Sequence, residues 1–356
     1  MKLKRVSYFF LFAVILSFSL SCALFKKPVP QKQQVFFPAI ADTPRIQYLR
    51  SFSSSDDVQK QQSKFARFVI GEKPKKEIKK PYGLFIKNAK LYICDTDLGG
   101  LEIIDLKENS FEYFVPEGSG QLLFPLNCFV DNDENLYVTD GKRQKIIVFD
   151  KLGNHIKSFG EKDNFKPIDL AVSGNKIFVT NIKNHQVLVY DKTDFHLIDA
   201  FPEIDKNQEG YLFNPMNLAV TNDKVYVSDF GDFKIKIFSH KGDYLKSVGS
   251  YGKNLGQFAR PKGIAVDKDS NLFVVDAAFE NVQIFNPEGQ LLMPFGGSYK
   301  GSGYMYLPAQ VVVDYDNLDY FQQYTDENYT LKYIILVSNQ FGPDKISLYG
   351  RITPKK

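Results

Sequence analysis

Residues 261–290 read PKGIAVDKDSNLFVVDAAFENVQIFNPEGQ and contain three short segments in which apolar and polar residues alternate. The segments GIAV, NLFVV and VQIF are separated by an Asp- and Asn-rich hairpin, a short polar loop and a turn with Pro and Gly. Alternation in short runs that are bounded by turn residues is typical of half-buried β-strands. The stretch therefore predicts a small antiparallel sheet.

The same pattern recurs at a nearly constant interval along the chain. The clearest copy is PLNCFVDNDENLYVTDGKRQKIIVFDKLGN at 125–154, and weaker copies lie on both sides of it. Each copy starts with a proline, namely Pro81, Pro125, Pro167, Pro215, Pro261 and Pro308, and successive starts are 44, 42, 48, 46 and 47 residues apart. A repeat of this length with several strands per unit is typical of propeller blades.

A fourth strand follows most of the repeats, as in NHIKSFG at 154–160 and DYLKSVG at 243–249. The sixth repeat lacks one, but RIQYLRSFS at 45–53 has the same pattern and precedes the first repeat. If this N-terminal strand completes the last sheet, no open edge remains between the first and last blades. We therefore predict an all-β, six-bladed β-propeller over 45–356, with an insertion at 314–332 in its last blade.

The repeat resembles the NHL repeat. It follows the pattern P-x-G-[IV]-A-V-D, a hairpin, [IL]-[YF]-V-x-D, a polar loop and [IV]-x-[VI]-[FY], and 184–186 read NHQ where that family carries Asn-His-Leu. The resemblance covers about 45–350 and implies the propeller fold. It implies little about function, because NHL-like propellers include scaffolds, RNA-binding proteins and metal-dependent lyases or lactonases.

Composition limits the classes of partner. The chain has 356 residues, 44% of them hydrophobic and 15% aromatic, with a formal net charge of only +4. Seven of its 45 basic residues are arginines, whereas bidentate recognition of phosphates and bases favours arginine, so we expect no nucleic-acid partner. The three cysteines, Cys22, Cys94 and Cys128, provide neither a disulfide framework nor a zinc or haem motif.

The N-terminus has the layout of an export signal. Lys2, Lys4 and Arg5 precede an apolar run that leads to small residues and Cys22. The end of the run resembles a bacterial lipobox, which implies a signal peptide over 1–22 and acylation of Cys22. The alternative is an ordinary cleavage site near this cysteine. Residues 23–44 have no apolar periodicity and predict a flexible tether. By resemblance to sorting rules, the absence of Asp after the cysteine favours the outer membrane of the cell envelope.

The third residue of each inner strand is expected at one mouth of the central channel. These residues are Gly83, Asn127, Asp169, Asn217, Gly263 and Gln310. The oxygens of Asn127, Asp169, Asn217 and Gln310 are of a kind that a Ca²⁺ ion accepts. The alternative is that these side chains bond to neighbouring strands and to channel water. We expect no other cofactor, and no inner strand carries the glutamate that calcium-dependent propellers of the gluconolactonase type use.

Other reactive residues are dispersed along the repeats. His155, His185, His196 and His240 fall in loops and turns of different blades, so no histidine cluster is expected. The hairpins at 131–135 and 267–271 have alternating oxygens but lack the later Gly and Glu of a calcium loop, and they predict Asx-rich turns. Cys94 and Cys128 lie within apolar strands and are expected to be buried.

Aromatic residues are predicted on both faces of the propeller. Phe230, Phe233, Phe279 and Phe341 lie in loops on one face, which also receives the lysine-rich segment 73–80. The insertion at 314–332 lies on the other face and combines acidic residues with Tyr320, Phe321 and Tyr324. Tyr and Phe are enriched in interface cores, so these seven aromatic residues are the candidates for partner contacts.

These observations favour a lipid-anchored scaffold or binding protein of the bacterial envelope, a monomeric propeller that docks a protein partner without catalysis. The alternative is an exported metal-dependent hydrolase or lyase with its site at the channel mouth. RNA binding is a third reading, and both export and the scarcity of arginine disfavour it.

Overall fold

The computed structural model confirms a six-bladed propeller. It describes residues 34–39, 43–59, 68, 71, 74–161 and 163–355. The compact propeller unit is Val35–Lys356. The predicted signal peptide, Cys22 and most of the predicted tether lie outside the described residues. No helix within the described ranges is both long and apolar enough to cross a membrane.

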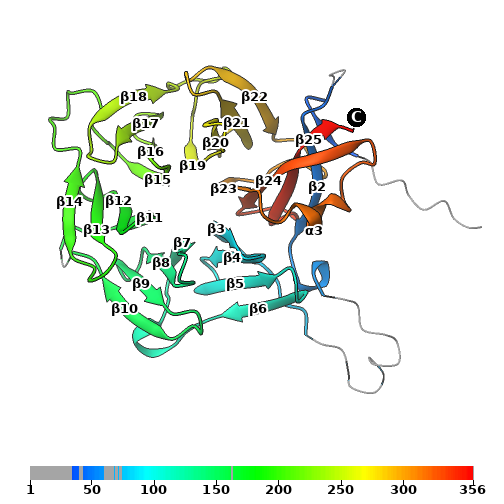
Figure 1. The fold of residues 1–356 in the computed structure, drawn as a ribbon, viewed down its shortest axis with the longest axis horizontal. Helices are drawn as coiled ribbons and strands as arrows, with labels where there is room; N and C mark the ends of the chain where they lie inside the picture. Colours follow the sequence, from blue (N-terminus) through cyan, green and yellow to red (C-terminus); the bar gives the residue numbers. More distant parts are fainter. Residues whose placement is uncertain are drawn as a thin grey trace, which may run out of the picture. The chain divides into compact units, whose positions relative to one another are not determined.

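Five four-stranded sheets form the first five blades, and the four strands follow chain order from the inner strand outwards (Figure 1). Blade 1 contains β3 (Pro81–Lys87), β4 (Lys90–Asp95), β5 (Gly100–Asp105) and β6 (Ser110–Phe114). Blade 2 contains β7 (Pro125–Val130), β8 (Leu136–Asp140), β9 (Lys145–Phe149) and β10 (His155–Phe159). Blade 3 contains β11 (Pro167–Ser173), β12 (Lys176–Asn181), β13 (Gln186–Asp191) and β14 (Leu197–Phe201).

Blades 4 and 5 repeat this order, and blade 6 combines both ends of the chain (Figure 1). Blade 4 contains β15 (Pro215–Val220), β16 (Lys224–Asp229), β17 (Lys234–Ser239) and β18 (Tyr244–Val248). Blade 5 contains β19 (Pro261–Val266), β20 (Leu272–Asp276), β21 (Asn281–Phe285) and β22 (Leu291–Gly296). Blade 6 contains β23 (Pro308–Asp314), β24 (Tyr329–Asn339), β25 (Ile346–Pro354), β2 (Ile46–Phe52) and β1 (Phe36–Phe37). The described residues also form the short helices η1 (Ser55–Asp57), η2 (Gly118–Gly120) and α3 (Leu318–Gln322).

The predicted closure by the N-terminal strand is confirmed. β2 pairs antiparallel with β25, and Tyr48 lies opposite Tyr349. A further strand was missed by the sequence analysis, because β1 pairs with β2 on its outer side and Phe37 is buried against blade 5 residues such as Phe295. The prediction of a tether as far as residue 44 is therefore wrong at its C-terminal end. The side chains of Phe36 and Phe37 pack against the core and hold β1 on the sheet.

The hydrophobic core is divided among the spaces between blades. Six buried clusters are present, and each joins the side chains of two adjacent sheets. Between blades 1 and 2, for example, Leu101 and Cys94 pack with Val138 and Phe149. Alternating residues of each strand point to opposite neighbours, so every blade is apolar on both of its faces.

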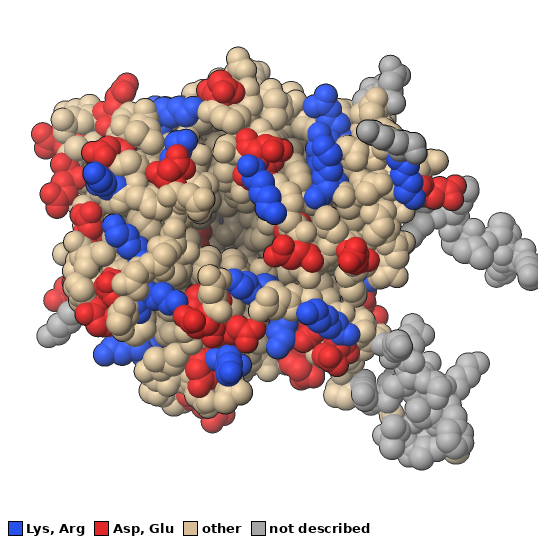
Figure 2. All heavy atoms as spheres, in the orientation of Figure 1, with Lys and Arg blue, Asp and Glu red and all other residues tan. Residues whose placement is uncertain are grey.

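The inner strands form a closed ring. Each of β3, β7, β11, β15, β19 and β23 contacts the next, and β23 contacts β3. Figure 2 shows basic and acidic side chains interspersed around a hollow at the centre of this ring. The loops that lead into the first strand of each blade, and those between its second and third strands, lie on one side, termed the loop face. The hairpins between first and second strands lie on the other side, termed the hairpin face.

Candidate functional site

A β-bulge sets the direction of the third side chain in the inner strands. The register between first and second strands shifts after the starting proline in all six blades. At this shift the N–H of Asp169 donates to Thr180 Oγ1 at 3.0 Å, and the same hydroxyl donates to the carbonyl of Met216 in the next blade at 2.7 Å. Asn127 and Thr139 repeat this arrangement, with Ile168 as the acceptor in the next blade. Adjacent blades are thus joined by hydrogen bonds beside the channel.

The structure brings three of the four predicted ligand residues into contact. Asn127 Nδ2 donates to Asp169 Oδ1, and Asn217 Nδ2 donates to Asp169 Oδ2 at 3.1 Å. All three are at most 2% exposed. Gln310 lies apart from them, and its Oε1 accepts the N–H of Val311 at 3.0 Å.

Asp169 has few free lone pairs for a metal ion. Each of its oxygens accepts two hydrogen bonds, because the N–H groups of Leu170 and Leu218 donate at 2.7 and 3.0 Å in addition to the two Asn side chains. Burial raises the pKa of Asp169 to about 7, although these four hydrogen bonds oppose the shift. Among the described residues, no group of three or more His, Cys, Asp or Glu side chains is placed to hold a metal ion. The contacts match the alternative of hydrogen bonds between strands.

A basic site in the channel was missed by the sequence analysis. Lys262 is the second residue of β19 and is only 5% exposed, and its Nζ lies 5.1 Å from the ring centroid of Tyr82 in β3. The signal in the sequence was a lysine and a tyrosine at a position where the other inner strands carry Leu126, Ile168, Met216 and Ala309. Contact between these two residues depends on ring closure, which the sequence of a single repeat does not show.

The aspartates that end the second strands are structural. Asp140 is fully buried and accepts the N–H groups of Leu123 and Phe124 at 2.6 and 3.0 Å. Its other oxygen accepts the N–H groups of Lys142 and Arg143. Asp95, Asp229 and Asp276 make corresponding bonds in their own blades. The Asp of the repeat pattern therefore fixes two loops of the loop face.

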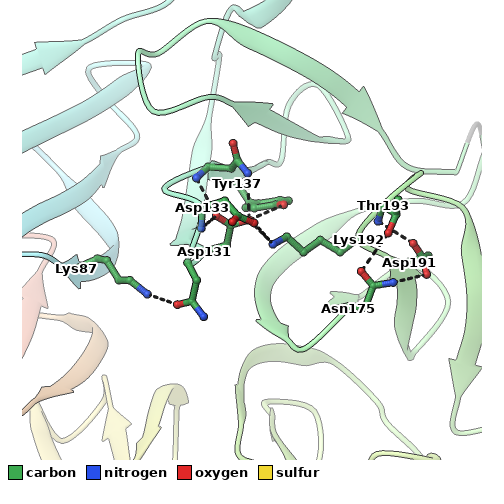
Figure 3. Close-up of polar contacts among 10 residues, drawn as sticks. Lys87, Asp131, Asp133, Tyr137, Asn175, Asp191, Lys192 and Thr193 are labelled. Carbon is green, nitrogen blue, oxygen red and sulfur yellow. Dashed lines mark hydrogen bonds and ion pairs between the residues drawn. The ribbon is translucent and has the colours of Figure 1, made fainter.

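The oxygen-rich hairpin at 131–135 binds a lysine of the next blade (Figure 3). Asp131 is 3% exposed, and its Oδ2 lies 2.8 Å from Lys192 Nζ, which is also 2.8 Å from Asp133 Oδ2. Burial alone would raise the pKa of Asp131, but hydrogen bonds from Lys192 and Asn135 hold it below its usual range. The N–H groups of Asp133 and Asn135 also donate to Asp131, so the prediction of an Asx-type turn matches the contacts.

The histidines lie apart, each with its own local partner. His185 Nδ1 bonds to the carbonyl of Phe213 at 2.6 Å, and His240 Nε2 bonds to the carbonyl of Thr221 at 2.9 Å. His155 contacts Ser119 and Ser158, whereas His196 contacts Asp194. Cys94 and Cys128 are free and buried, as predicted, and burial raises the pKa of the Cys94 thiol.

The loop face carries several aromatic rings that are partly or largely exposed. The ring centroids of Phe230 and Phe233 are 6.0 Å apart, and Phe233 lies 4.7 Å from Tyr251, which is 67% exposed. Phe341 is 54% exposed, and Lys80 Nζ lies 5.8 Å from its ring centroid. Phe279 is partly exposed.

The insertion on the hairpin face is packed onto the propeller and is termed the flap. Its candidate Phe321 is fully buried in the core between blades 6 and 1, so the prediction that this ring contacts a partner is wrong. The Tyr324 hydroxyl accepts a hydrogen bond from Arg50 Nη1 at 2.6 Å, and the Arg50 guanidinium lies over the same ring. Tyr320 is partly exposed on α3. Packing of α3 against β24 holds the flap on the propeller.

Comparison with known proteins supports the fold. Residues 206–349 match the model of a family described as 6-bladed beta-propeller. No curated protein sequence matches the chain. A structure of a protein of unknown function from Bacteroides thetaiotaomicron is similar, with a TM-score of 0.58 at 14% identity, and the match covers 87% of this chain and 76% of that one.

Two similar solved structures are lyases. Virginiamycin B lyase from Staphylococcus aureus has a TM-score of 0.52 at 14% identity, and the match covers 77% of this chain and 96% of the lyase. A streptogramin B lyase has a TM-score of 0.51 at 12% identity, with coverage of 77% and 93%. Identities this low show a common fold and nothing about activity. The family match, the solved structures and the six sheets agree that this chain is a six-bladed β-propeller.

Proposed function

We propose that this protein is an exported, lipid-anchored and non-catalytic propeller that binds a protein partner in the bacterial cell envelope. The export and anchoring steps rest on the signal-like segment and Cys22. The binding role rests on one observation above all, the accessible aromatic rings of the loop face, where Phe233 packs on the exposed Tyr251 and Phe341 is also exposed. Buried Asp229 and Asp276 fix the loops of blades 4 and 5 that carry Phe233 and Tyr251, and buried Asn339 bonds to the loop of Phe341, so the rings lie on a rigid scaffold, which lowers the entropy lost on docking.

A crosslinked pull-down from native envelopes tests the binding role. The lipidated protein is compared with the double variant Tyr251→Ser, Phe341→Ser and with Tyr320→Ser, which removes one partly exposed ring from the opposite face. We expect one crosslinked partner to be lost in the double variant and retained in Tyr320→Ser. Identical partners in all three proteins, or loss in Tyr320→Ser alone, would contradict docking on the loop face.

Incorporation of a labelled fatty acid tests the anchor. The wild type should carry the label in the membrane fraction, whereas Cys22→Ser should be unlabelled and released as a soluble protein. An equally labelled Cys22→Ser variant would place the acyl chain elsewhere and remove this part of the proposal.

The second candidate, a hydrolase or lyase that uses a calcium-like ion, is favoured only by the convergence of Asn127, Asp169 and Asn217 beside the channel. We rank it lower because the two oxygens of Asp169 already accept four hydrogen bonds. Thermal unfolding with Ca²⁺ and with a chelator separates the two. A clear increase in Tm with Ca²⁺ would support this candidate, and equal Tm values would leave the binding role as the better explanation.

A further inference from the structure

The amine of Lys262 lacks a counter-ion. No ion pair or hydrogen bond joins its Nζ to a residue of the described ranges, although Lys262 is only 5% exposed. Its recorded contact is the ring of Tyr82, two blades further around the ring. β23 lies between these blades and presents the small Ala309 at the equivalent position. Because Ala309 is small, no large side chain lies between the Lys262 amine and the Tyr82 ring on the other side of β23.

The electrostatics of this position favour a bound anion. Burial lowers the pKa of Lys262 to about 8, and the nearby positive charge of Arg260 acts in the same direction. Arg260 itself is exposed at the end of the loop that leads into β19, and its side chain has no acidic partner among the described residues. A largely buried lysine without a counter-ion is costly to keep charged, and an anion that enters the channel would remove much of that cost.

We propose that this side of the channel binds a small organic monocarboxylate, held by the Lys262 amine, the Arg260 guanidinium and the Tyr82 hydroxyl. The planar guanidinium and the ammonium group are donors that match the two oxygens of a carboxylate. Binding of this anion does not depend on the proposed docking of a protein partner, because docking involves the aromatic rings of the loop face and not the channel.

Charge and shape select this class of ligand. Burial raises the pKa of Tyr82 to about 12, the nearby carboxylate of Asp169 adds to this shift, and the positive charge of Arg260 opposes it. The positive charges of Lys262 and Arg260 and the negative charge of Asp169 therefore lie near this position, a balance that fits a monoanion better than a phosphate dianion. The equivalent positions in blades 2, 3 and 4 carry Leu126, Ile168 and Met216, which would offer an apolar surface to the body of the ligand. An acid with an aromatic or aliphatic body meets both conditions.

Benzoate serves as the probe, and isothermal titration with the propeller in its full chain measures binding at constant ionic strength. Lys262→Met keeps an unbranched side chain that is only one atom shorter and removes its charge. Lys253→Met is the matched control, because Lys253 is exposed in the loop that leads into the same strand. We expect benzoate to bind the wild type and the control equally, and Lys262→Met to bind at least about tenfold more weakly, as loss of a charge-assisted hydrogen bond requires.

Competitive acetylation of the lysines gives a second measurement that needs no variant. Benzoate should slow the modification of Lys262 and leave Lys253 unchanged, as read by peptide mass spectrometry. The proposal is overturned if benzoate fails to bind, binds Lys262→Met as tightly as the wild type, or leaves the acetylation of Lys262 unchanged. Equal or tighter binding of inorganic phosphate in the same titration would overturn the assignment to a monocarboxylate.

Discussion

At the scale of single residues, one position in the third strand repeatedly carries a buried polar side chain. This residue is Lys236 in blade 4 and Gln283 in blade 5, and each has a partner. Lys236 Nζ lies 2.9 Å from Asp229 Oδ2, and Gln283 Nε2 donates to the carbonyl of Gln257 at 2.9 Å. In blade 1 the equivalent residue is Glu102, and neither of its oxygens accepts a hydrogen bond from a described residue. Burial and the neighbouring Asp95 raise the pKa of Glu102 to about 10, so the folded protein keeps this carboxyl neutral.

Glu102→Gln should stabilise the protein as the pH rises. The pKa in the folded state lies above the usual carboxyl value of 4.5, so the folded protein loses stability as the pH rises from 4.5 towards the folded pKa. Below about pH 4.5 the variant and the wild type should be nearly equal, and the advantage of the variant should grow by up to about 1.4 kcal/mol per pH unit. Urea unfolding at pH 5 and pH 8 measures the difference, and parallel loss of stability in both proteins would contradict it.

Asp169→Asn should lower stability most at acidic pH. In the variant, the amide NH2 group replaces one oxygen of Asp169 and faces the two N–H donors that bond to that oxygen. Loss of these two of the four hydrogen bonds should lower the free energy of unfolding by about 1–3 kcal/mol. Because the pKa of Asp169 in the folded protein is raised to about 7, the wild type also loses stability as the pH rises from about 4 to 7. The variant has no ionisable group at this position and does not show this loss.

The difference in the free energy of unfolding between the wild type and Asp169→Asn should therefore become smaller as the pH rises from 5 to 8. Chemical denaturation at both values measures it, with Asp163→Asn as the exposed control. A difference that stays constant over this range would show that Asp169 ionises without a shifted pKa.

At the scale of elements, the hairpin of blade 2 is tied to the turn between β13 and β14 of blade 3 by Lys192 (Figure 3). Two further contacts extend this connection towards blade 1, since Lys87 Nζ and Asn88 Nδ2 donate to Asn132 and Glu134 at 2.7 and 2.8 Å. The hairpins thus form a polar network across three blades on the side of the molecule opposite the aspartate-capped loops.

Lys192→Met should cost about 1–2 kcal/mol, because it leaves the buried carboxylate of Asp131 without its cation. Lys90→Met is the control, since Lys90 is 48% exposed and its pair with Asp105 is 3.8 Å long, and it should change stability by less than about 0.5 kcal/mol. The pKa of Asp131 is lowered in the folded state, so its contribution is present at neutral pH and is lost as the pH falls below about 4. Thermal unfolding at pH 7 and pH 3.5 measures both effects, and equal Tm changes in the two variants would contradict the role of Lys192.

At the scale of the whole molecule, the propeller is closed by strands from both ends of the chain. β2 covers the outer edge of β25, and β1 then covers β2. Buried residues of the N-terminal segment, Ile46 and Phe52 among them, belong to two different clusters on either side of blade 6. Closure therefore contributes to both interfaces of this blade.

Removal of the closing strand should destroy cooperative folding. A chain that begins at residue 54 exposes the edge of β25 and the apolar surfaces against which Ile46, Phe52 and Phe37 pack, so we expect aggregation or loss of the unfolding transition. A chain that begins at residue 34 keeps β1 and β2 and should have the Tm of the longer protein. Scanning calorimetry of both chains measures this, and a cooperative transition in the shorter one would contradict closure by β2.

Much of the architecture was determined by the sequence itself. Alternating apolar residues between regular prolines predicted six sheets and the strand that closes them, because strand formation and blade length are local properties that recur in every repeat. The burial of Cys94 and Cys128 followed from the same alternation. The strand at Phe36–Phe37 was not predicted, because two residues are too few to show a period.

Only the tertiary structure decided what the side chains beside the channel contact. The sequence placed Asn127, Asp169, Asn217 and Gln310 at equivalent positions, but the bulge turned three of them towards one another and left Gln310 apart. Lys262 and Tyr82 are 180 residues apart in sequence and meet because the ring closes. Contacts of this kind depend on the angle between blades and on which small residue lies between them, and neither is a property of a local sequence pattern.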